Sequence, residues 1–207
     1  MLKQKMTRRE LLAMTGALGA LSFLPVREAF AAPQRATTTV TLTAQEKSDL
    51  LFMREEEKLA RDVYLTLHDV WGTPVFANIA ISEQQHMDAV LGLLNLYKLP
   101  DPTVGKLIGE FVNAELQALY NELVERGRHS VVEALKVGGA IEETDIEDLA
   151  TAMETARPAN IDSVYQNLLN GSYNHLRAFA SNLQSLTGAP YTAQVVSQAV
   201  VDSILNS

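Results

Sequence analysis

Cysteine is absent from the 207 residues of this chain. A protein without thiols can form no disulfide, zinc–thiolate site or iron–sulfur cluster, and it has no thiol nucleophile. Any metal site must therefore use oxygen and imidazole ligands, which suit iron, manganese, zinc, magnesium or calcium. The sequence also contains no phosphate-binding glycine loop and no nucleophile motif of the kinds found in hydrolases and kinases.

Basic residues are in the minority. The chain has 17 Lys and Arg against 25 Asp and Glu, which gives a formal net charge of −8 and a pI near 5.0. Five of the basic residues and two of the acidic ones fall within residues 1–31, so the remainder carries a formal charge of −11. A surface this acidic argues against nucleic acid as the main partner and favours the attraction of cations.

Long hydrophobic runs are also lacking. The apolar stretch that follows Arg8 and Arg9 ends near Leu24 and is too short to span a bilayer as a stable helix. A small-x-small site at residues 29–31 comes next. A basic start, a short apolar middle and such a site predict a secretory signal over residues 1–31.

The paired arginines of this segment resemble those of twin-arginine signals. That resemblance implies export of a folded protein, often with a metal or cofactor already installed. An ordinary Sec signal that happens to carry two arginines is the alternative. We therefore expect a protein exported to the periplasm or beyond the cell, with a polar, flexible N-terminus at residues 32–42.

Apolar residues in the rest of the chain recur at helical spacing, and no strand pattern competes with them. Thr43 and Glu46 form a capping box, and Gly72-Thr73-Pro74 ends the helix that it starts. The predicted long helices cover about residues 43–71, 74–97, 130–156 and 160–186. A shorter helix at 114–126, capped by Asn113, lies within a proline-containing segment at 98–128, and a last amphipathic stretch covers 193–205.

These elements predict an all-α fold, with a four-helix bundle at residues 43–190 and a short C-terminal helix or tail at 191–207. The long helices form two hairpins, which residues 98–128 join as a long crossover with its own short helix, a known bundle topology. A helix of about 24 residues is roughly 36 Å long. The crossover has enough residues to return over that distance.

Polar residues interrupt the apolar stripe of each long helix near its middle. They are Glu57 in the first helix, Glu83 and His86 in the second, Glu142 and Asp145 in the third, and Ser172 and His175 in the fourth. All lie about 11 to 18 residues from a hairpin turn, which places them in one cross-section of the bundle. Buried carboxylates are paired or bind metal, because an unpaired one is very costly.

Four carboxylates and two imidazoles in one layer match a site for two iron or two manganese ions. The predicted metal ligands are Glu57, Glu83, His86, Glu142, Asp145 and His175.

The residues around these positions resemble a known family. Glu57–Tyr64 is similar to the first-helix signature of rubrerythrins and ferritins, and Glu83–His86 is similar to their second-helix ligand pair. Residues 44–190, including Glu142–Ile146 and Gly171–Phe179, resemble an uncharacterised secreted family of the ferritin-like superfamily. The resemblance implies a ferritin-like bundle and metal binding, without an established activity.

Two departures from the rubrerythrin pattern qualify this expectation. The fourth helix has Ser172-x-x-His175 where Glu-x-x-His is the rule. Asp145 can supply the missing carboxylate, which leaves open whether a second metal binds weakly or not at all. The cysteine-bound iron module of rubrerythrins is absent, so electrons would have to come from a partner or a small reductant.

Several of the predicted ligands have an adjacent residue or a second role as an alternative. Glu56 competes with Glu57, which we favour because Tyr64 repeats its face, and Glu143 competes with Glu142, which we favour on helical phase. Asp145 is either a ligand or an orienting partner of a histidine. Tyr64 is either core packing or a hydrogen-bonding neighbour of the metals.

The remaining acids and histidines have simpler interpretations. His175 is either a ligand or a core histidine with its hydrogen bonds satisfied. Glu115 follows a predicted N-cap, where an acid meets the helix dipole favourably, so we expect a structural role for it. His68 and His129 lie near helix ends and are expected at the solvated surface.

Three functions fit these patterns. The first is a redox enzyme whose two metal ions react with oxygen or peroxide, as a ferroxidase, peroxide reductase or catalase, with an external electron donor where one is needed. The second is a non-catalytic metal-binding or stress protein outside the cytoplasm. The third is a structural bundle with a closed polar network. Fold alone does not choose among them, and the oligomeric state, a homo-oligomer included, stays open.

Overall fold

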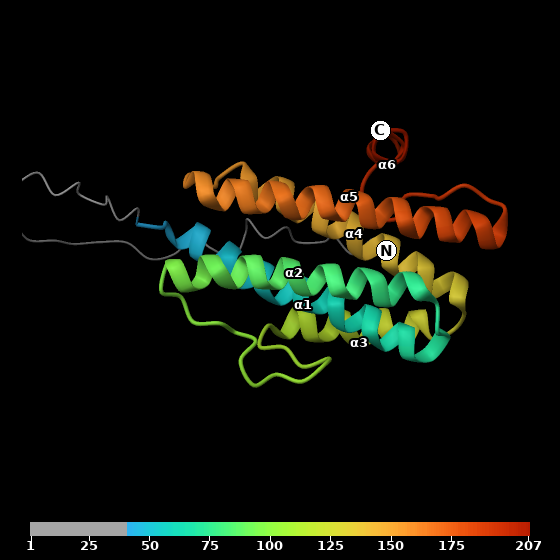
Figure 1. The fold of residues 1–207 in the computed structure, drawn as a ribbon, viewed down its shortest axis with the longest axis horizontal. Helices are drawn as coiled ribbons and strands as arrows, with labels where there is room; N and C mark the ends of the chain where they lie inside the picture. The colour runs from blue at the N-terminus through green and yellow to red at the C-terminus, as the bar shows by residue number, and fades with distance from the viewer. Residues whose placement is uncertain (1–40) are drawn as a thin grey trace, which may run out of the picture. The chain divides into compact units, whose positions relative to one another are not determined.

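A computed structural model describes residues 41–207, which contain six helices and no strand (Figure 1). The helices are α1 (Ala44–Trp71), α2 (Pro74–Leu96), α3 (Ala114–Gly127), α4 (Val131–Met153), α5 (Ala159–Thr187) and α6 (Gln198–Leu205). The all-helical prediction is confirmed for this part of the chain. The predicted signal at residues 1–31 and nearly all of the flexible N-terminus lie outside the described residues. No helix that the structure describes is long and apolar enough to cross a membrane.

The sequence signals at the start and end of α1 act as predicted. The Thr43 hydroxyl accepts a hydrogen bond from the Glu46 backbone N–H at 3.1 Å, and the Glu46 carboxylate accepts one from the Thr43 N–H at 2.7 Å. The helix ends at Gly72, whose φ of 62° lies in the left-handed region that glycine adopts without strain. Glu46 also accepts a hydrogen bond from the Arg157 N–H at 3.0 Å, which ties this end of α1 to the turn between α4 and α5.

The four long helices lie side by side (Figure 1). The hairpin partners α1 and α2 pack together, as do α4 and α5, and the two hairpins meet where α1 contacts α4 and α2 contacts α5. Between them lies one core, whose largest fully buried apolar side chains are Phe76, Phe179, Leu50, Met53, Leu59, Leu67, Leu94, Leu135 and Leu149. Burial of each such side chain stabilises the fold by about 1.5–3 kcal/mol. The centres of the helices are thereby fixed against one another.

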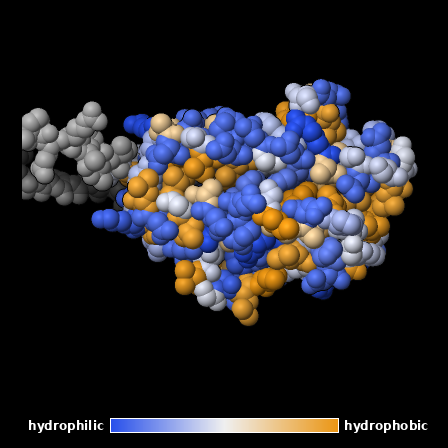
Figure 2. Space-filling model, in the orientation of Figure 1, coloured by the Kyte–Doolittle hydropathy of each residue, from blue (hydrophilic) through white to orange (hydrophobic). Residues whose placement is uncertain are grey.

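The crossover between α2 and α3 covers a second, charged face of α1. Arg54 forms a bidentate ion pair with Asp101, at 3.0 and 3.1 Å. The buried Lys58 ammonium contacts Asp62 and donates to the Leu107 carbonyl at 2.7 Å. Figure 2 shows hydrophobic side chains at the lower edge of the view, where Figure 1 places the crossover. The exposed apolar residues of the crossover are Val104, Leu107, Ile108 and Val112. The crossover therefore binds α1 through polar groups and through Phe111, which is buried in the core beneath the Lys58 ammonium.

Candidate metal centre

The six predicted ligands are all buried near the middle of their helices. Their exposed fractions are 1% for Glu57, 2% for Glu83, 9% for His86, 2% for Glu142, 7% for Asp145 and 7% for His175. Helix α1 provides one of them, α2 two, α4 two and α5 one. The apolar layers above and below hold these helices together, so the polar groups cannot turn to solvent without opening the core.

Five of the six form two overlapping triads. Glu57, Glu83 and His86 place one donor atom each within 4.8 Å of one another, and Glu83, Glu142 and His175 do the same. Glu83 belongs to both groups, so the triads share one carboxylate. Each triad is a set of oxygen and imidazole donors that can hold a metal ion.

The two histidines direct the same ring nitrogen toward the carboxylates. His86 Nδ1 lies 2.9 Å from Glu83 Oε2 and 3.2 Å from Glu57 Oε2. His175 Nδ1 lies 2.8 Å from Glu83 Oε1 and 3.4 Å from Glu142 Oε2. The two rings are stacked, with centroids 5.4 Å apart. Helices α2 and α5 therefore contribute matching donors on the two sides of Glu83.

The far side of each imidazole ring is fixed by a small residue. His175 Nε2 lies 2.9 Å from the Ser82 hydroxyl. His86 Nε2 faces Gly171 of α5, where an added Cβ would lie only 2.4 Å away. Gly171 thus provides the space that the His86 ring occupies. A hydrogen bond or a close contact at Nε2 leaves Nδ1 as the nitrogen available to the centre.

Asp145 lies beside the triads but belongs to neither. Its Oδ2 accepts a hydrogen bond from the Ser172 hydroxyl, while its buried Oδ1 has no hydrogen-bond partner. Ser172 occupies the position where rubrerythrins have a glutamate. Its hydroxyl binds Asp145, the residue whose carboxylate we expected to replace that glutamate. Ligation by Asp145 remains a prediction.

Tyr64 combines the two roles that the sequence left open. Its ring is fully buried and lies 5.2 Å from the Phe179 ring and 6.3 Å from the Phe76 ring, measured between centroids. Its hydroxyl donates a hydrogen bond of 2.5 Å to Glu142 Oε1. The aromatic packing fixes the hydroxyl, and the hydroxyl in turn orients the carboxylate. Glu142 Oε2 then points to His175.

The competing glutamates have different outcomes. Glu143 is fully buried but points away from the triads, because it accepts hydrogen bonds from the Tyr191 hydroxyl and from the backbone N–H groups of residues 194–196. It attaches the C-terminal segment to α4. Glu56 is also buried, at 6% exposure, beside Asp148 and Asp145 of α4. The sequence favoured Glu57 over Glu56 as a ligand and did not predict that both would be buried.

Residues interpreted as structural lie away from the centre. Glu115 is exposed at the start of α3, where the Asn113 side chain accepts hydrogen bonds from the first backbone N–H groups. His129 is exposed and His68 is partly exposed, and each has its Nδ1 3.2 Å from a backbone carbonyl. None of the three approaches the triads.

Electrostatics couple the histidines to the shared carboxylate. Burial alone would lower the pKa of His86, but Glu57 and Glu83 raise that pKa to about 11. Burial likewise opposes the charge on His175, whereas Glu142 and Glu83 raise the pKa of His175 to about 10. Burial would raise the pKa of Glu83, but the two histidines lower it to about 2. In the metal-free protein, two imidazolium groups therefore share the ionised Glu83.

The other three acids hold their protons more strongly than isolated carboxyl groups do. Burial and the charge of Asp145 raise the pKa of Glu57 well above its usual value. Burial and the charge of Glu142 raise the pKa of Asp145 to about 7. Burial also raises the pKa of Glu142, against the opposing effect of His175. Four ionised carboxylates would carry more negative charge than the two histidines neutralise, so the metal-free cluster retains protons on its acids.

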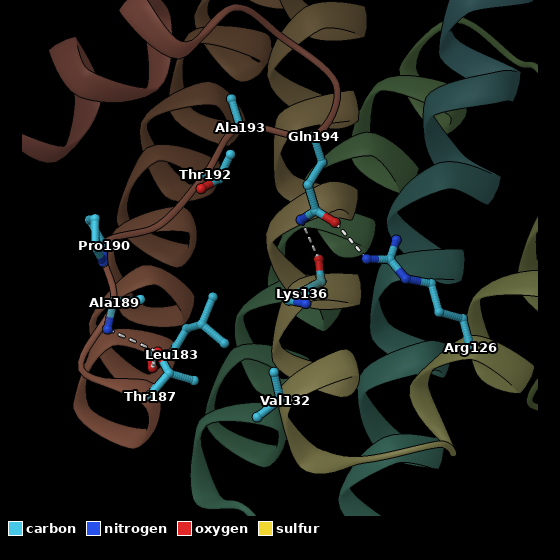
Figure 3. Close-up of a pocket in the computed structure, with 10 residues that line it drawn as sticks. All are labelled: Arg126, Val132, Lys136, Leu183, Thr187, Ala189, Pro190, Thr192, Ala193 and Gln194. Atoms are coloured by element: carbon cyan, nitrogen blue, oxygen red, sulfur yellow. Dashed lines mark hydrogen bonds between the residues drawn. The ribbon is translucent and has the colours of Figure 1, made fainter.

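A separate cavity of about 460 Å³ lies beneath the segment that follows α5 (Figure 3). Gln194 spans its rim, accepting a hydrogen bond from Arg126 and donating one to the Lys136 carbonyl. The other lining residues are Val132, Leu183, Thr187, Ala189, Pro190, Thr192 and Ala193. The cavity shares no residue with the triads and is not a part of the candidate metal centre.

Fold and site together define an all-helical protein with a buried carboxylate–histidine cluster that can hold metal. Residues 46–207 match the model of an uncharacterized protein domain, DUF2202, and the chain belongs to that family. The chain is 48% identical to uncharacterized protein MJ0754 of Methanocaldococcus jannaschii over 166 residues, which are 80% of this chain and 89% of the relative. It is also similar to a crystal structure of hypothetical protein MJ0754, with a TM-score of 0.78, 45% identity, and coverage of 90% of this chain and 98% of that one.

Proposed function

We propose that this protein is a ferritin-like bundle that binds two iron or two manganese ions and uses them in redox chemistry with oxygen or peroxide. The observation that carries the proposal is the pair of triads that meet at Glu83. One ion would lie among Glu57, Glu83 and His86, and the other among Glu83, Glu142 and His175. Asp145 would complete the second set or orient it. Paired helices that supply inward carboxylates and histidines are how ferritin-like sites are built.

The residues fit a pair of divalent cations. Buried side-chain atoms without a hydrogen-bond partner include Glu57 Oε1 and Asp145 Oδ1, which both belong to predicted ligands. Buried polar atoms usually have partners, so a group of exceptions at one place favours a missing ligand. The charges agree with this interpretation, since four carboxylates balance two divalent ions when both histidines are neutral.

A pair of such ions, when bound, would supply the two electrons and the open coordination positions that reduction of oxygen or peroxide needs. The protein would supply position and protons. Tyr64 holds Glu142, Ser172 holds Asp145, and Ser82 and Gly171 fix the two imidazole rings. Because the chain has no cysteine to bind a second redox centre, we propose an external electron donor.

Non-catalytic metal binding is the second candidate, and the Asp145–Ser172 hydrogen bond favours it. Because this bond occupies Oδ2, Asp145 has only Oδ1 left for the second ion, so that position can stay incompletely coordinated. The acidic composition of the chain suits either role outside the cytoplasm. We propose export by the twin-arginine route, which would allow the metals to be installed before the folded protein leaves the cytoplasm.

The test is elemental analysis of the purified protein, followed by assays of oxygen and peroxide consumption after loading with iron(II) or manganese(II). We expect both metal positions to fill in the wild type. The loaded protein should consume both oxygen and peroxide. His86→Ala should lose metal, whereas His129→Ala, at an exposed histidine, should not. Equal metal content in the two variants would refute the site. Metal binding without consumption of either oxidant would favour the non-catalytic role.

A further inference from the structure

The crossover between α2 and α3 carries a cluster of apolar side chains at the surface. Val104 is 76% exposed, Leu107 70%, Ile108 56% and Val112 62%. They fall within nine residues, at the lower edge of the view in Figure 2. The other exposed large apolar residues of the described chain are scattered over α1, α2, α5 and the C-terminal segment. Single exposed apolar residues are ordinary on a protein surface, whereas a cluster marks an interaction site.

The crossover holds these side chains outward because its backbone is bound to α1. Three buried charged residues make the contacts: the Glu55 carboxylate accepts from the Val112 N–H at 2.6 Å, the Asp62 carboxylate accepts from the Gly109 N–H at 2.9 Å, and the Lys58 ammonium donates to the Leu107 carbonyl at 2.7 Å. On either side of the tip, Gly105 and Gly109 turn the chain with φ values of 75° and 80°. The apolar side chains are therefore displayed in a fixed arrangement, which lowers the entropy cost of binding.

The charges around this cluster indicate what it binds. Residues 104–112 contain one base, Lys106, and one acid, Glu110, and so carry no net charge, whereas residues 32–207 carry −11. Nucleic acid and anionic lipid surfaces attract positively charged faces, so neither is favoured here. Copies of this acidic chain repel one another over most of their surface, but not at a neutral patch.

One base and one acid also form a self-complementary set. In a two-fold interface the same patch of both copies meets, so that each residue contacts a different residue of its counterpart and the contact is repeated. Lys106 of each copy can then pair with Glu110 of the other, while the apolar side chains between them face one another. The patch is thus complementary, in charge and in hydrophobicity, to a second copy of itself.

We propose that residues 104–112 of two copies pack together and form a two-fold symmetric homodimer. A standard interface takes about 20–30 residues from each partner, and this patch is smaller, so the dimer should dissociate at concentrations on the order of micromolar. The dimer does not depend on the proposed metal centre, which lies among the four long helices of a single chain. Metal-free and metal-loaded protein should therefore dimerise alike.

The first test is sedimentation of the purified protein at concentrations from micromolar to millimolar. We expect monomers at the low end and dimers at the high end. Leu107→Ser should raise the Kd of the dimer about tenfold or more, because the symmetric interface loses one buried leucine from each copy. Leu186→Ser, at a leucine of α5 that is 52% exposed, is the matched control and should dimerise as the wild type does.

Exchange of the two charges tests the symmetry of the contact. Lys106→Glu and Glu110→Lys should each weaken the dimer, because each variant sets like charges against one another across the interface. An equimolar mixture of the two variants should dimerise again, since every charge then meets its opposite on the other chain. Lys106 is half-buried and Glu110 is exposed, so both variants should fold, which circular dichroism checks. Variants that dimerise no better when mixed than alone would refute the pairing of Lys106 with Glu110.

Two further results would overturn the proposal. A dimer whose Kd is unchanged in Leu107→Ser would place the contact between copies on another face. A wild type that stays monomeric at millimolar concentration would give the patch a different occupant. Flotation with phosphatidylcholine vesicles then identifies it, because binding that Leu107→Ser abolishes indicates a lipid surface, and no binding indicates a different protein. Metal content, measured on the same samples, reports on the metal centre separately.

Discussion

Glu83 contacts His175 across the interface of the two hairpins, with Oε1 and Nδ1 2.8 Å apart, while its other oxygen lies 2.9 Å from His86 of its own helix. One carboxylate thus joins both triads. We expect Glu83→Gln to lose metal at both positions, whereas Glu57→Gln should retain metal at the position formed with His175. Elemental analysis after equilibration with manganese(II) measures the difference. Equal losses in the two variants would show that Glu83 has no special position between the ions.

Two buried glutamates should respond in opposite ways to replacement by leucine. Glu57 has an unpartnered oxygen and a pKa raised well above its usual value by burial and by Asp145. Because Glu83, 2.9 Å from His86, still pairs that histidine when Glu57 is removed, Glu57→Leu should stabilise the metal-free protein by about 1 kcal/mol through loss of a buried acid. Glu143 instead accepts several hydrogen bonds from the C-terminal segment. Glu143→Leu should cost about 3 kcal/mol or more.

Urea unfolding without metal measures both changes. Glu57→Leu should also lose the stabilisation that metal gives the wild type, which is about 2.7 kcal/mol at a hundredfold excess over Kd. Glu143→Leu should keep that stabilisation, since Glu143 is outside both triads. A metal-free Glu57→Leu protein less stable than the wild type would show that Glu57 contributes to packing even without metal.

Local signals in the sequence predicted the helices because caps and breakers act within one or two turns. The capping box at Thr43 and the left-handed Gly72 are examples. The layer of Glu57, Glu142 and their partners could be predicted for a related reason. In antiparallel hairpins, equal distances from the turns bring residues to the same level, whatever the details of packing.

The burial of other charged residues depends on tertiary contacts, which the helical periodicity of the sequence does not predict. Lys58 and Asp62 lie on a charged face of α1 that would be exposed in an isolated hairpin, and the crossover buries them. Glu56 is buried because α4 packs across it, and Glu143 because the C-terminal segment returns to α4. In each case the side chain has ordinary surface chemistry. Only the path of a distant segment decides its burial.

Metal binding should release protons near neutral pH. Metal-free His86 and His175 have pKa values of about 11 and about 10, so both are protonated at pH 7, yet their Nδ1 atoms must be free to bind metal. Asp145, with a pKa of about 7, contributes part of another proton. We therefore expect net proton release and an apparent affinity that rises with pH. Calorimetry in buffers of different ionisation enthalpy measures the release, and uptake without release would contradict the assignment of the histidines.

The same pKa values predict how the stability of the metal-free protein depends on pH. A histidine whose folded pKa exceeds its unfolded value contributes stability that is complete below about pH 6.5 and is lost as the pH rises through the folded value. The contribution of His86 and His175 should thus decline between about pH 6.5 and 11. Bound metal should remove this decline, because it replaces the protons. Thermal melting across that range, with and without manganese(II), compares the two forms.

Gly171 should be intolerant of the smallest side chain. Inside a helix, alanine normally stabilises by about 1 kcal/mol relative to glycine. At Gly171 of α5, however, the added Cβ would lie 2.4 Å from His86 Nε2 and 2.6 Å from its Cε1. Since the ring is held on its other side by Glu57 and Glu83, it would have to leave the first triad. Gly171→Ala should therefore lose metal from the first triad. It should also lack the stability that alanine normally adds in a helix.

Gly92 of α2 is the matched control, because an added Cβ at that position meets nothing within 4 Å. Gly92→Ala should raise the free energy of unfolding by about 1 kcal/mol and leave metal content unchanged. Denaturant unfolding and elemental analysis of both variants provide the comparison. If Gly171→Ala gained stability and bound metal as the wild type does, the His86 ring would have another position available, and the first triad would not depend on the close approach of α5.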